Sequence, residues 1–369
     1  MRNLRFRAPR LERFRILLTS DDRSMSPMPS NKLSSIIPVV GQDGVHSMKP
    51  VMHLMVSLLF LLGGTLPSHA EGGNLKKPDA VVAADGSGDF NSIQAAIMAA
   101  PYRASGDEWT IRIQPGIYRE RVYVQRERGY LRLIADDPKT TCLVHQVHAN
   151  MPGPDGLPLG TFATPTLQID GDGFEIENLT IENAAGPVGQ ALALRTDGDK
   201  LVFRNCRFLG WQDTIFLNRG RSYFENCRIE GHVDFIFGGA TAWFENCTIH
   251  SRKSGYLTAA STPPDQAYGF VFHRCQLTGT EGQPYFLGRP WRPHAMTAFI
   301  DCEMDAKLRP EGWKEWNAPD HAATVRYGEL RSSGPGAALA KRVAWAKPVP
   351  KDLTAAKVLA GSDGWIPKP

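Results

Sequence analysis

Two aspartates stand 21 residues apart in similar surroundings, Asp213 within G-W-Q-D-T (210–214) and Asp234 within G-H-V-D-F-I-F-G (231–238). The chain around them repeats with almost the same period. If each repeat is one coil of a solenoid, the aspartates become neighbours on adjacent coils. A single loop aspartate is more often a turn or capping residue. A carboxylate pair, however, can supply a nucleophile together with a general acid or base, so the spacing favours chemistry.

The element that must position this pair is a short repeated strand. Its six copies share an apolar first position, and three of them contain an Asn-Cys pair; they begin at Ile176, Phe203, Phe224, Phe244, Phe272 and Phe299. Successive starts lie 27, 21, 20, 28 and 27 residues apart, which is the scale of repeat architectures. Apolar and polar residues alternate within each copy and helical spacing is absent, which favours strands. We therefore expect an all-β fold, a single-stranded right-handed parallel β-helix.

Stacking of coils would align like residues. The cysteines are expected to fill the core, and the asparagines Asn178, Asn205, Asn226 and Asn246 are expected to satisfy backbone groups at a turn. An N-terminal capping helix is predicted around residues 92–100, with Asp89 as a capping residue. The segment G-I-Y-R-E (116–120) is interpreted as a turn between strands, and the C-terminal part is expected to pack back over the coils.

Composition agrees with one large domain preceded by a leader. The 369 residues are 42% hydrophobic and 22% charged, enough to bury a substantial core. The formal charge of +4 arises within residues 1–47, which hold eight Lys or Arg against four Asp or Glu. The rest of the chain sums to zero, so neither a nucleic-acid partner nor an anionic membrane is expected.

The N-terminal 70 residues divide into two segments. Residues 1–47 are rich in Arg, Ser and Pro and are expected to be a disordered leader or the product of a mis-assigned start. Residues 48–70 have the basic start, apolar middle and small-residue end of a secretory signal peptide with cleavage near Ala70. The alternative is a transmembrane anchor, but the apolar run is shorter than the roughly 20 residues that a span needs. A secreted or periplasmic catalytic domain is therefore expected over residues 71–369.

An exported chain permits disulfides. Six cysteines are present, and coil stacking favours a pair between Cys227 and Cys247, which lie 20 residues apart and flank Asp234. The ten histidines show no metal-ligand spacing, so no metal is assigned.

From about Val81 onward the chain resembles the pectin methylesterases, carbohydrate esterases that demethylate the galacturonate chain of plant cell walls. The markers occur in family order: D-G-S-G-D-F (85–90), G-I-Y-R-E (116–120), Q-A-L-A-L (190–194), Q-D-T (212–214), V-D-F-I-F-G (233–238) and L-G-R-P-W (287–291). The resemblance implies hydrolysis of C6 methyl esters of pectin to pectate and methanol, without a cofactor and by a monomer. No G-x-S-x-G elbow is present, so a serine hydrolase loses its usual signature.

The resemblance also implies roles for five residues. Asp234 would be the nucleophile that forms an acyl-enzyme, and Asp213 would be the general acid and then the base. Arg289 would hold Asp234 ionised and oriented. Gln190 and Gln212 would donate hydrogen bonds to the oxyanion. Taken singly, Arg289 could be a surface cation and Gln190 could bond a neighbouring coil.

Three further residues match substrate contacts of the family. Phe237 and Trp291 would offer flat apolar faces to sugar rings, although both could instead be core, and Thr161 matches a substrate-contact threonine. The chain departs from the family at Trp211, where relatives usually carry tyrosine, and at Ile215, where leucine is common. Neither change removes a catalytic atom, but Trp211 could reshape a subsite.

Two other classes of function remain open from the sequence. A β-helical galacturonan hydrolase would place an acid and a base across a glycosidic bond, and a lyase would usually need a calcium-binding carboxylate cluster. A non-catalytic glycan-binding solenoid would tolerate loss of the aspartate pair. Methanol release without chain shortening distinguishes an esterase from these alternatives.

Overall fold

The computed structural model describes residues 77–102, 109–316 and 321–368. These residues belong to one compact unit, Gly72–Pro369. The expected leader (1–47) and signal peptide (48–70) lie outside the described residues, so both stay predictions.

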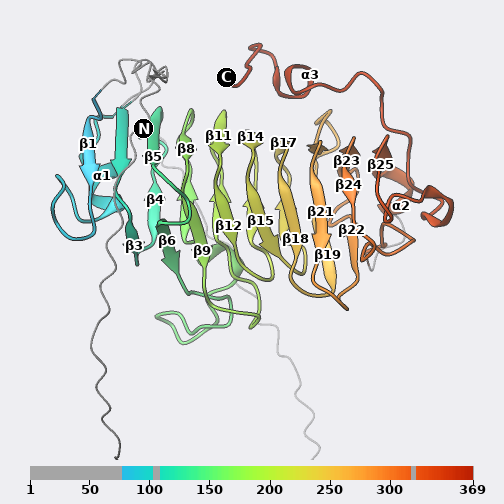
Figure 1. The fold of residues 1–369 in the computed structure, drawn as a ribbon, viewed down its shortest axis with the longest axis horizontal. Coiled ribbons are helices and arrows are strands. Elements are labelled where there is room, and N and C mark those ends of the chain that lie inside the picture. Colours follow the sequence, from blue (N-terminus) through green and yellow to red (C-terminus); the bar gives the residue numbers. More distant parts are fainter. Residues whose placement is uncertain (1–76, 103–108, 317–320, 369) are drawn as a thin grey trace, which may run out of the picture. The chain divides into compact units, whose positions relative to one another are not determined.

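The described chain winds into a right-handed parallel β-helix with three sheets (Figure 1). Neighbouring strands within each sheet are parallel. Sheet 1 contains β1 (Ala80–Val82), β2 (Trp109–Ile113), β5 (Leu131–Ala135), β8 (Glu175–Glu177), β11 (Leu201–Arg204), β14 (Arg221–Glu225), β17 (Thr241–Glu245), β20 (Phe270–His273), β23 (Met296–Ile300) and β25 (Arg326–Leu330). Sheet 2 contains β4 (Val122–Val124), β7 (Leu167–Ile169), β10 (Leu194–Thr196), β13 (Ile215–Leu217), β16 (Ile236–Gly238), β19 (Gly255–Ala260) and β22 (Tyr285–Gly288). Sheet 3 contains β3 (Gly116–Tyr118), β6 (Thr141–His145), β9 (Thr180–Asn183), β12 (Arg207–Leu209), β15 (Arg228–Gly231), β18 (Thr248–Ser251), β21 (Gln276–Gly279) and β24 (Glu303–Met304).

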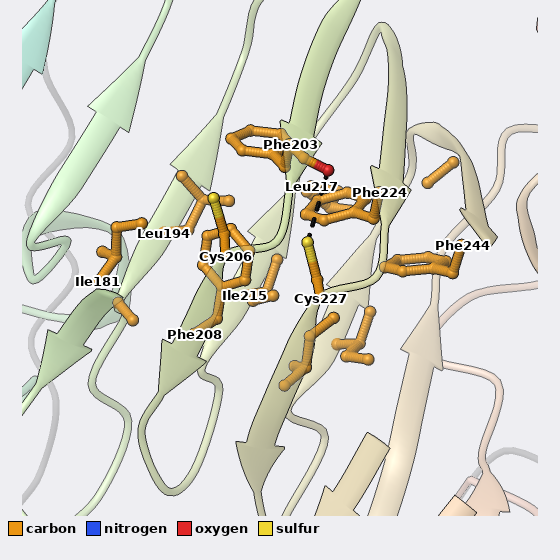
Figure 2. Close-up of a cluster of buried hydrophobic side chains, with 14 of the residues drawn as sticks. Ile181, Leu194, Phe203, Cys206, Phe208, Ile215, Leu217, Phe224, Cys227 and Phe244 are labelled. Carbon is orange, nitrogen blue, oxygen red and sulfur yellow. Dashed lines mark hydrogen bonds between the residues drawn. The ribbon is translucent and has the colours of Figure 1, made fainter. Parts of the chain in front are cut away.

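The predicted repeat forms the inner ladder of sheet 1. Each first residue of the motif pairs with its counterpart on the next coil, as Phe203 does with Phe224 and Phe244 does with Phe272. Their buried rings stack with centroids 4.6 and 4.4 Å apart. Figure 2 shows the Phe203, Phe224 and Phe244 rings of this ladder. This spacing follows from the separation of about 4.8 Å between neighbouring strands. The predicted fold is therefore confirmed, and the ladder gives the site a rigid support.

The predicted disulfide between Cys227 and Cys247 is wrong: both cysteines are free and buried. The Sγ atom of Cys227 lies 3.4 Å from the carbonyl oxygen of Phe203 (Figure 2). The Sγ atom of Cys247 lies 3.7 Å from the carbonyl oxygen of Phe224. Each thiol thus points toward the backbone of the preceding coil. Stacked cysteines project in parallel, whereas a disulfide needs a dihedral angle near 90° between its two arms.

The asparagines of the motif occupy a turn for a conformational reason that the sequence analysis did not identify. Asn178, Asn205, Asn226 and Asn246 all have φ between 52° and 58°, the left-handed region that asparagine tolerates better than most residues. Hydrogen bonds add to this, because the Asn178 side chain donates to the carbonyl of Ala135. The expected turn position is confirmed for all four, whereas a side-chain bond to the backbone is confirmed for Asn178; Asn246 instead donates to the side chain of Asn226.

The N-terminal capping helix is present as α1 (Ile93–Ala99), within the predicted range. Its N-cap is Ser92, whose hydroxyl accepts from the Ala95 amide, and not Asp89, which instead accepts from the Val81 amide. Glu120 accepts from the amides of Ile93 and Gln94. The last residue of the G-I-Y-R-E motif therefore binds the first turn of the helix, where a negative charge is favoured.

The C-terminal segment returns over the outer face of sheet 1 (Figure 1). It contains the 3-10 helix η2 (Leu339–Lys341) and α3 (Ala355–Leu359), after the short helix α2 (His321–Thr324). Leu353, Val358 and Leu359 pack with Trp243 and Val271 in one apolar cluster. The expectation that this part packs over the coils is confirmed. No helix among the described residues is long and apolar enough to cross a membrane.

Candidate active site

Asp213 and Asp234 lie at equivalent positions on adjacent coils, in the turns that lead into β13 and β16. The register pairs Ile215 with Ile236, and the Asp213 amide donates to the carbonyl of Val233 at 3.1 Å. Both aspartates have left-handed backbones, with φ of 63° and 52°. We call the two residues the dyad. Unusual backbone angles of this kind gather at functional sites, where the surrounding structure must enforce them.

Glycines permit both turns. A Cβ atom on Gly210 would stand 2.6 Å from Oγ1 of Thr214, and one on Gly231 would stand 2.3 Å from Cβ of Phe235. The Thr214 hydroxyl also donates to the carbonyl of Glu230 on the next coil. The glycine that precedes each aspartate by three residues is thus needed because the turn folds closely onto its own strand.

The dyad opens into a cavity of about 290 Å³ on the outer side of sheet 2, here called the dyad cavity. Its walls comprise Thr161, Phe162, Gln190, Gln212, Asp213, Asp234, Phe237, Ala259, Arg289, Trp291 and Trp316. All eight residues that the sequence analysis assigned to catalysis or substrate binding are in this set. These eight residues lie between positions 161 and 291 of the chain and are brought together by coil stacking.

Arg289 forms a two-bond pair with Asp234, from Nε at 3.0 Å and from the second guanidinium nitrogen at 2.7 Å. Its guanidinium lies 4.2 Å from the ring centroid of Tyr256 and 4.0 Å from that of Trp316. Two hydrogen bonds to Asp234 and contacts with two aromatic rings therefore fix the orientation of the planar guanidinium. This arrangement orients the Asp234 carboxylate.

Burial is the main cause of the electrostatic character of the dyad. It raises the pKa of Asp213 well above the ordinary range of a carboxyl, and the nearby charge of Asp234 raises it further. Burial also raises the pKa of Asp234, but the hydrogen bonds from Arg289 oppose that effect. Among the described residues, Arg289 bonds directly to Asp234 and not to Asp213, and a bonded cation favours ionisation of the carboxyl that it contacts.

Two amide side chains border the dyad. Gln190 and Gln212 form a parallel bridge between adjacent coils, with the Ala191 amide donating to the carbonyl of Gln212. Among the described residues, neither glutamine side chain donates to a protein atom, although both line the cavity. The backbones are fixed and the amide groups are available, which is what a preformed oxyanion site requires.

Aromatic rings form the apolar side of the cavity. Phe237 stacks on Phe216 at 4.7 Å and meets the Trp291 ring edge-on at 5.8 Å. Phe162 extends the row, 4.9 Å from Phe216. Thr161 begins the short 3-10 helix η1 (Thr161–Ala163) and reaches the cavity beside these rings. The row can therefore offer stacking surface beside the dyad.

The sequence analysis missed Tyr256 and Trp316, the rings that hold Arg289. Tyr256 lies 22 residues after Asp234, so the coil period could have indicated it. Trp316 lies outside every strand, and no period predicts its place. Trp211, which differs from the family pattern, packs against His232 and Arg252 and does not line the dyad cavity. Across residues 77–102, 109–316 and 321–368, no cluster of three or more His, Cys, Asp or Glu could hold a metal.

Comparison with known proteins assigns this arrangement to a family. The family profile described as Pectinesterase matches residues 79–360. Pectinesterase 31 of Arabidopsis thaliana is 38% identical over 278 residues, which cover 73% of this chain and 87% of the relative. The chain spans about half the length of several plant relatives that are named as pectinesterase/pectinesterase inhibitors.

Solved structures give the same result. A pectin methylesterase from carrot is 34% identical with a TM-score of 0.69, over 73% of this chain and 87% of that one. A pectin methylesterase in complex with a hexasaccharide is 29% identical with a TM-score of 0.68, over 79% of this chain and 99% of the other.

Proposed function

The chain belongs to the pectinesterase family, a carboxylic ester hydrolase that demethylesterifies pectin, and from this premise we propose that the dyad carries its chemistry. Asp234 is the nucleophile and Asp213 is the general acid and base. The observation that carries the proposal is the two-bond pair from Arg289 to Asp234, which has no counterpart on Asp213 within the part of the chain that the structure describes.

In the first half-reaction, the Asp234 carboxylate attacks C6 of a methylated galacturonate. A tetrahedral intermediate forms, and its oxyanion accepts hydrogen bonds from the Gln190 and Gln212 amides. The carbon–oxygen bond to the methoxy group then breaks while Asp213 gives its proton to that oxygen. Methanol leaves, an anhydride joins Asp234 to the sugar, and Asp213 is left as a carboxylate.

In the second half-reaction, Asp213 acts as a base. It removes a proton from a water molecule, whose oxygen attacks C6 of the anhydride, and the same two glutamines bind the oxyanion again. The bond to Asp234 breaks, which restores its carboxylate and leaves Asp213 protonated. The product carboxylic acid loses its proton to solvent. Both aspartates are thus returned to their starting states.

The aromatic row beside the dyad is proposed as the sugar-binding surface. Phe237 and Trp291 present ring faces and edges at the cavity, and Thr161 offers a hydroxyl next to them. A solved pectin methylesterase with a bound hexasaccharide supports a polysaccharide ligand. We also propose that the enzyme is a monomer that is secreted or periplasmic after cleavage near Ala70. It is proposed to act without metal, nucleic acid or membrane.

Attack at a glycosidic bond and binding without catalysis are the competing assignments for the dyad. Free amides beside a carboxylate pair favour an acyl oxyanion, because glycosidic cleavage does not produce one. The test uses highly methylated pectin and measures methanol release and polymer length together. Wild-type protein is expected to release methanol at constant polymer length, and Asp213→Ala and Asp234→Ala are expected to release none. Shortened chains, or methanol release by Asp234→Ala at the wild-type rate, would contradict the proposed function.

A further inference from the structure

Arg252, which does not line the dyad cavity, binds the first residue of both turns that carry the dyad. We call these the dyad turns (210–213 and 231–234). The Arg252 backbone amide donates to the carbonyl of Gly231 at 2.7 Å, and its guanidinium donates to the carbonyl of Gly210 at 3.0 Å. Arg252 follows β18, one coil beyond Asp234 and two coils beyond Asp213. One residue on a third coil therefore joins the turns of both aspartates.

The bond from the guanidinium stands where the parallel ladder between coils slips by one residue. At Gly231 the ladder is regular, because the Arg252 amide on the next coil donates to the Gly231 carbonyl. The equivalent donor for Gly210 would be the His232 amide, but that amide donates to the carbonyl of Trp211 at 2.9 Å. A backbone carbonyl that loses its ladder donor needs another one. The Arg252 guanidinium supplies it to Gly210 from two coils away.

Glu230 and Trp211 hold the Arg252 guanidinium in this position. Nε of Arg252 donates to Oε2 of Glu230 at 2.8 Å, and the guanidinium carbon lies 5.0 Å from the Trp211 ring centroid. Glu230 is buried, and its other oxygen accepts from Nε of Arg228 at 2.6 Å. Burial alone would raise the pKa of Glu230, but the hydrogen bonds from the two arginines outweigh it and lower that pKa. The carboxylate is therefore a charged anchor for Arg252.

We propose that Arg252 is a positioning residue of the esterase reaction, which fixes the separation of Asp213 from Asp234 by binding the dyad turns. This inference rests on the proposed function. Asp234 attacks C6 while Asp213 delivers a proton to the methoxy oxygen on the same carbon, so the two carboxyl groups must keep one separation. Within the described residues, Arg252 bonds to neither carboxyl group. It acts through the glycine carbonyls and touches no reacting atom.

The test measures kcat and KM for methanol release from a fully methylated oligogalacturonide, which carries no titrating carboxyl of its own. The proteins are the full-length wild type, Arg252→Met and the control Arg228→Met. Methionine removes the guanidinium but keeps the backbone bond to Gly231. The control removes the cation from the other oxygen of Glu230. In Arg252→Met, kcat is expected to fall about tenfold while KM changes less than about twofold, because misplacement of reacting groups slows the chemical step. The control is expected to keep the wild-type kcat.

The pH dependence of kcat/KM gives a second readout, which a merely structural role would not move. Burial raises the pKa of Asp213, the charge of Asp234 adds to this effect, and the charge of Arg289 opposes it. A loosened Asp213 turn weakens the two larger causes, because the carboxyl moves toward water and away from Asp234, so its pKa falls. Methanol release requires the protonated form. The alkaline limb of the profile is therefore expected at lower pH in Arg252→Met and at the wild-type position in Arg228→Met.

Arg252→Lys is the conservative variant. An ammonium group can bind Glu230 or the Gly210 carbonyl but lacks the planar fork that reaches both, so its kcat is expected between those of Arg252→Met and wild type. If Arg252→Met does not fold, the same measurements on Arg252→Lys decide. An unchanged kcat, an equal fall in the control, or a fall in kcat with an unmoved alkaline limb would overturn the inference. Absence of methanol release by the wild type would instead contradict the proposed function.

Discussion

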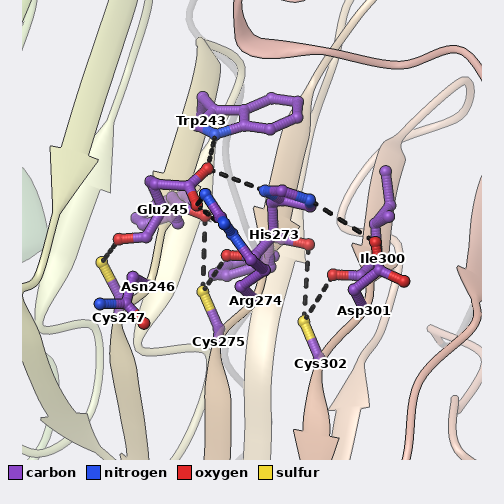
Figure 3. Close-up of polar contacts among 12 residues, drawn as sticks. Trp243, Glu245, Asn246, Cys247, His273, Arg274, Cys275, Ile300, Asp301 and Cys302 are labelled. Atoms are coloured by element: carbon purple, nitrogen blue, oxygen red, sulfur yellow. Dashed lines mark hydrogen bonds and ion pairs between the residues drawn. The ribbon is translucent and has the colours of Figure 1, made fainter.

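Carboxylates lie on two outer faces of the same coils, and the two faces give them different hydrogen-bond and ionic partners. On sheet 1, Glu245 is bonded by the Trp243 indole at 2.8 Å, by His273 at 2.8 Å and by Arg274 at 2.8 Å (Figure 3). On sheet 2, Asp213 and Asp234 have one directly bonded cation between them, Arg289. On the first face each negative charge has nearby hydrogen-bond donors, whereas on the second face two neighbouring carboxyl groups compete for one cation.

The pKa values differ accordingly. Burial alone would raise the pKa of Glu245, but hydrogen bonds from Trp243, His273 and Arg274 outweigh burial and lower it. Burial raises the pKa of Asp213 well above its ordinary range, and the charge of Asp234 adds to that effect. The pKa of the structural carboxyl Glu245 is thus lowered, whereas the pKa of Asp213 in the dyad is raised. A carboxyl pKa that is shifted upward, toward the neutral form, marks the functional face.

The largest expected effect is the loss of activity in Asp234→Asn. The amide preserves shape but cannot act as a nucleophile, so methanol release should be abolished. The free energy of unfolding should change by no more than about 1–2 kcal/mol, because the scaffold is untouched. Enzyme assays and chemical denaturation measure the two quantities. Full activity in this variant would remove Asp234 from the mechanism.

A smaller loss is expected in Arg289→Lys. Lysine keeps the charge but loses the fork that binds both Asp234 oxygens and the planar surface that contacts Tyr256 and Trp316. A misplaced nucleophile costs roughly 10²-fold in rate, so kcat should fall by about that factor while KM changes less. The matched control is Arg274→Lys on sheet 1, where kcat should stay at the wild-type value. Equal kcat values in the two variants would show that Arg289 does not position the nucleophile.

On the opposite face, Glu245→Gln should reduce stability and leave activity intact. Replacing charge-assisted hydrogen bonds by neutral ones should cost about 1.5–3 kcal/mol at neutral pH. Because the folded pKa of Glu245 is lowered, its stabilisation is present above the unfolded pKa and is lost as pH falls through the folded pKa. The deficit of the variant should therefore shrink in acid. A deficit that is constant from pH 7 to about pH 3 would argue against this role.

The smallest effect, and the one of opposite sign, is expected for the stability of Asp213→Asn. The folded pKa of Asp213 is raised, so its stabilisation is present below the unfolded pKa and is lost as pH rises through the folded pKa. Asparagine does not ionise. The Tm of the variant relative to wild type should therefore increase from pH 4 to pH 8, as measured by calorimetry. A Tm difference that falls over this range would mean that the pKa of Asp213 is not raised.

The comparison of the two faces also explains how much the sequence could predict. The coil period predicted the fold and placed Asp213 beside Asp234, because stacking converts a spacing in sequence into a spacing in space. It could not predict that Trp316 covers Arg289, since that tryptophan follows no strand. The resemblance to a known family supplied Arg289 itself, 55 residues beyond Asp234.

Two predictions, the disulfide and the helix cap, were wrong for physical reasons that a pattern of strand residues does not encode. Cys227 and Cys247 stack as predicted, but stacked side chains project in parallel and bond to backbone carbonyls, so proximity did not imply a disulfide. The helix cap was assigned to Asp89, whereas Ser92 caps α1 and Glu120 reaches its amides from a later coil. The second contact depends on tertiary structure.

The proposed mechanism requires that Asp213 holds a proton while Asp234 is ionised, and carbon-13 NMR titration of the labelled carboxyl groups would measure both states. Asp213→Asn and Asp234→Asn would assign the two signals. Asp234 is expected to ionise first, and Asp213 is expected to stay protonated well above the ordinary range near pH 4. Ionisation of Asp213 before Asp234, or of both groups within that ordinary range, would contradict it.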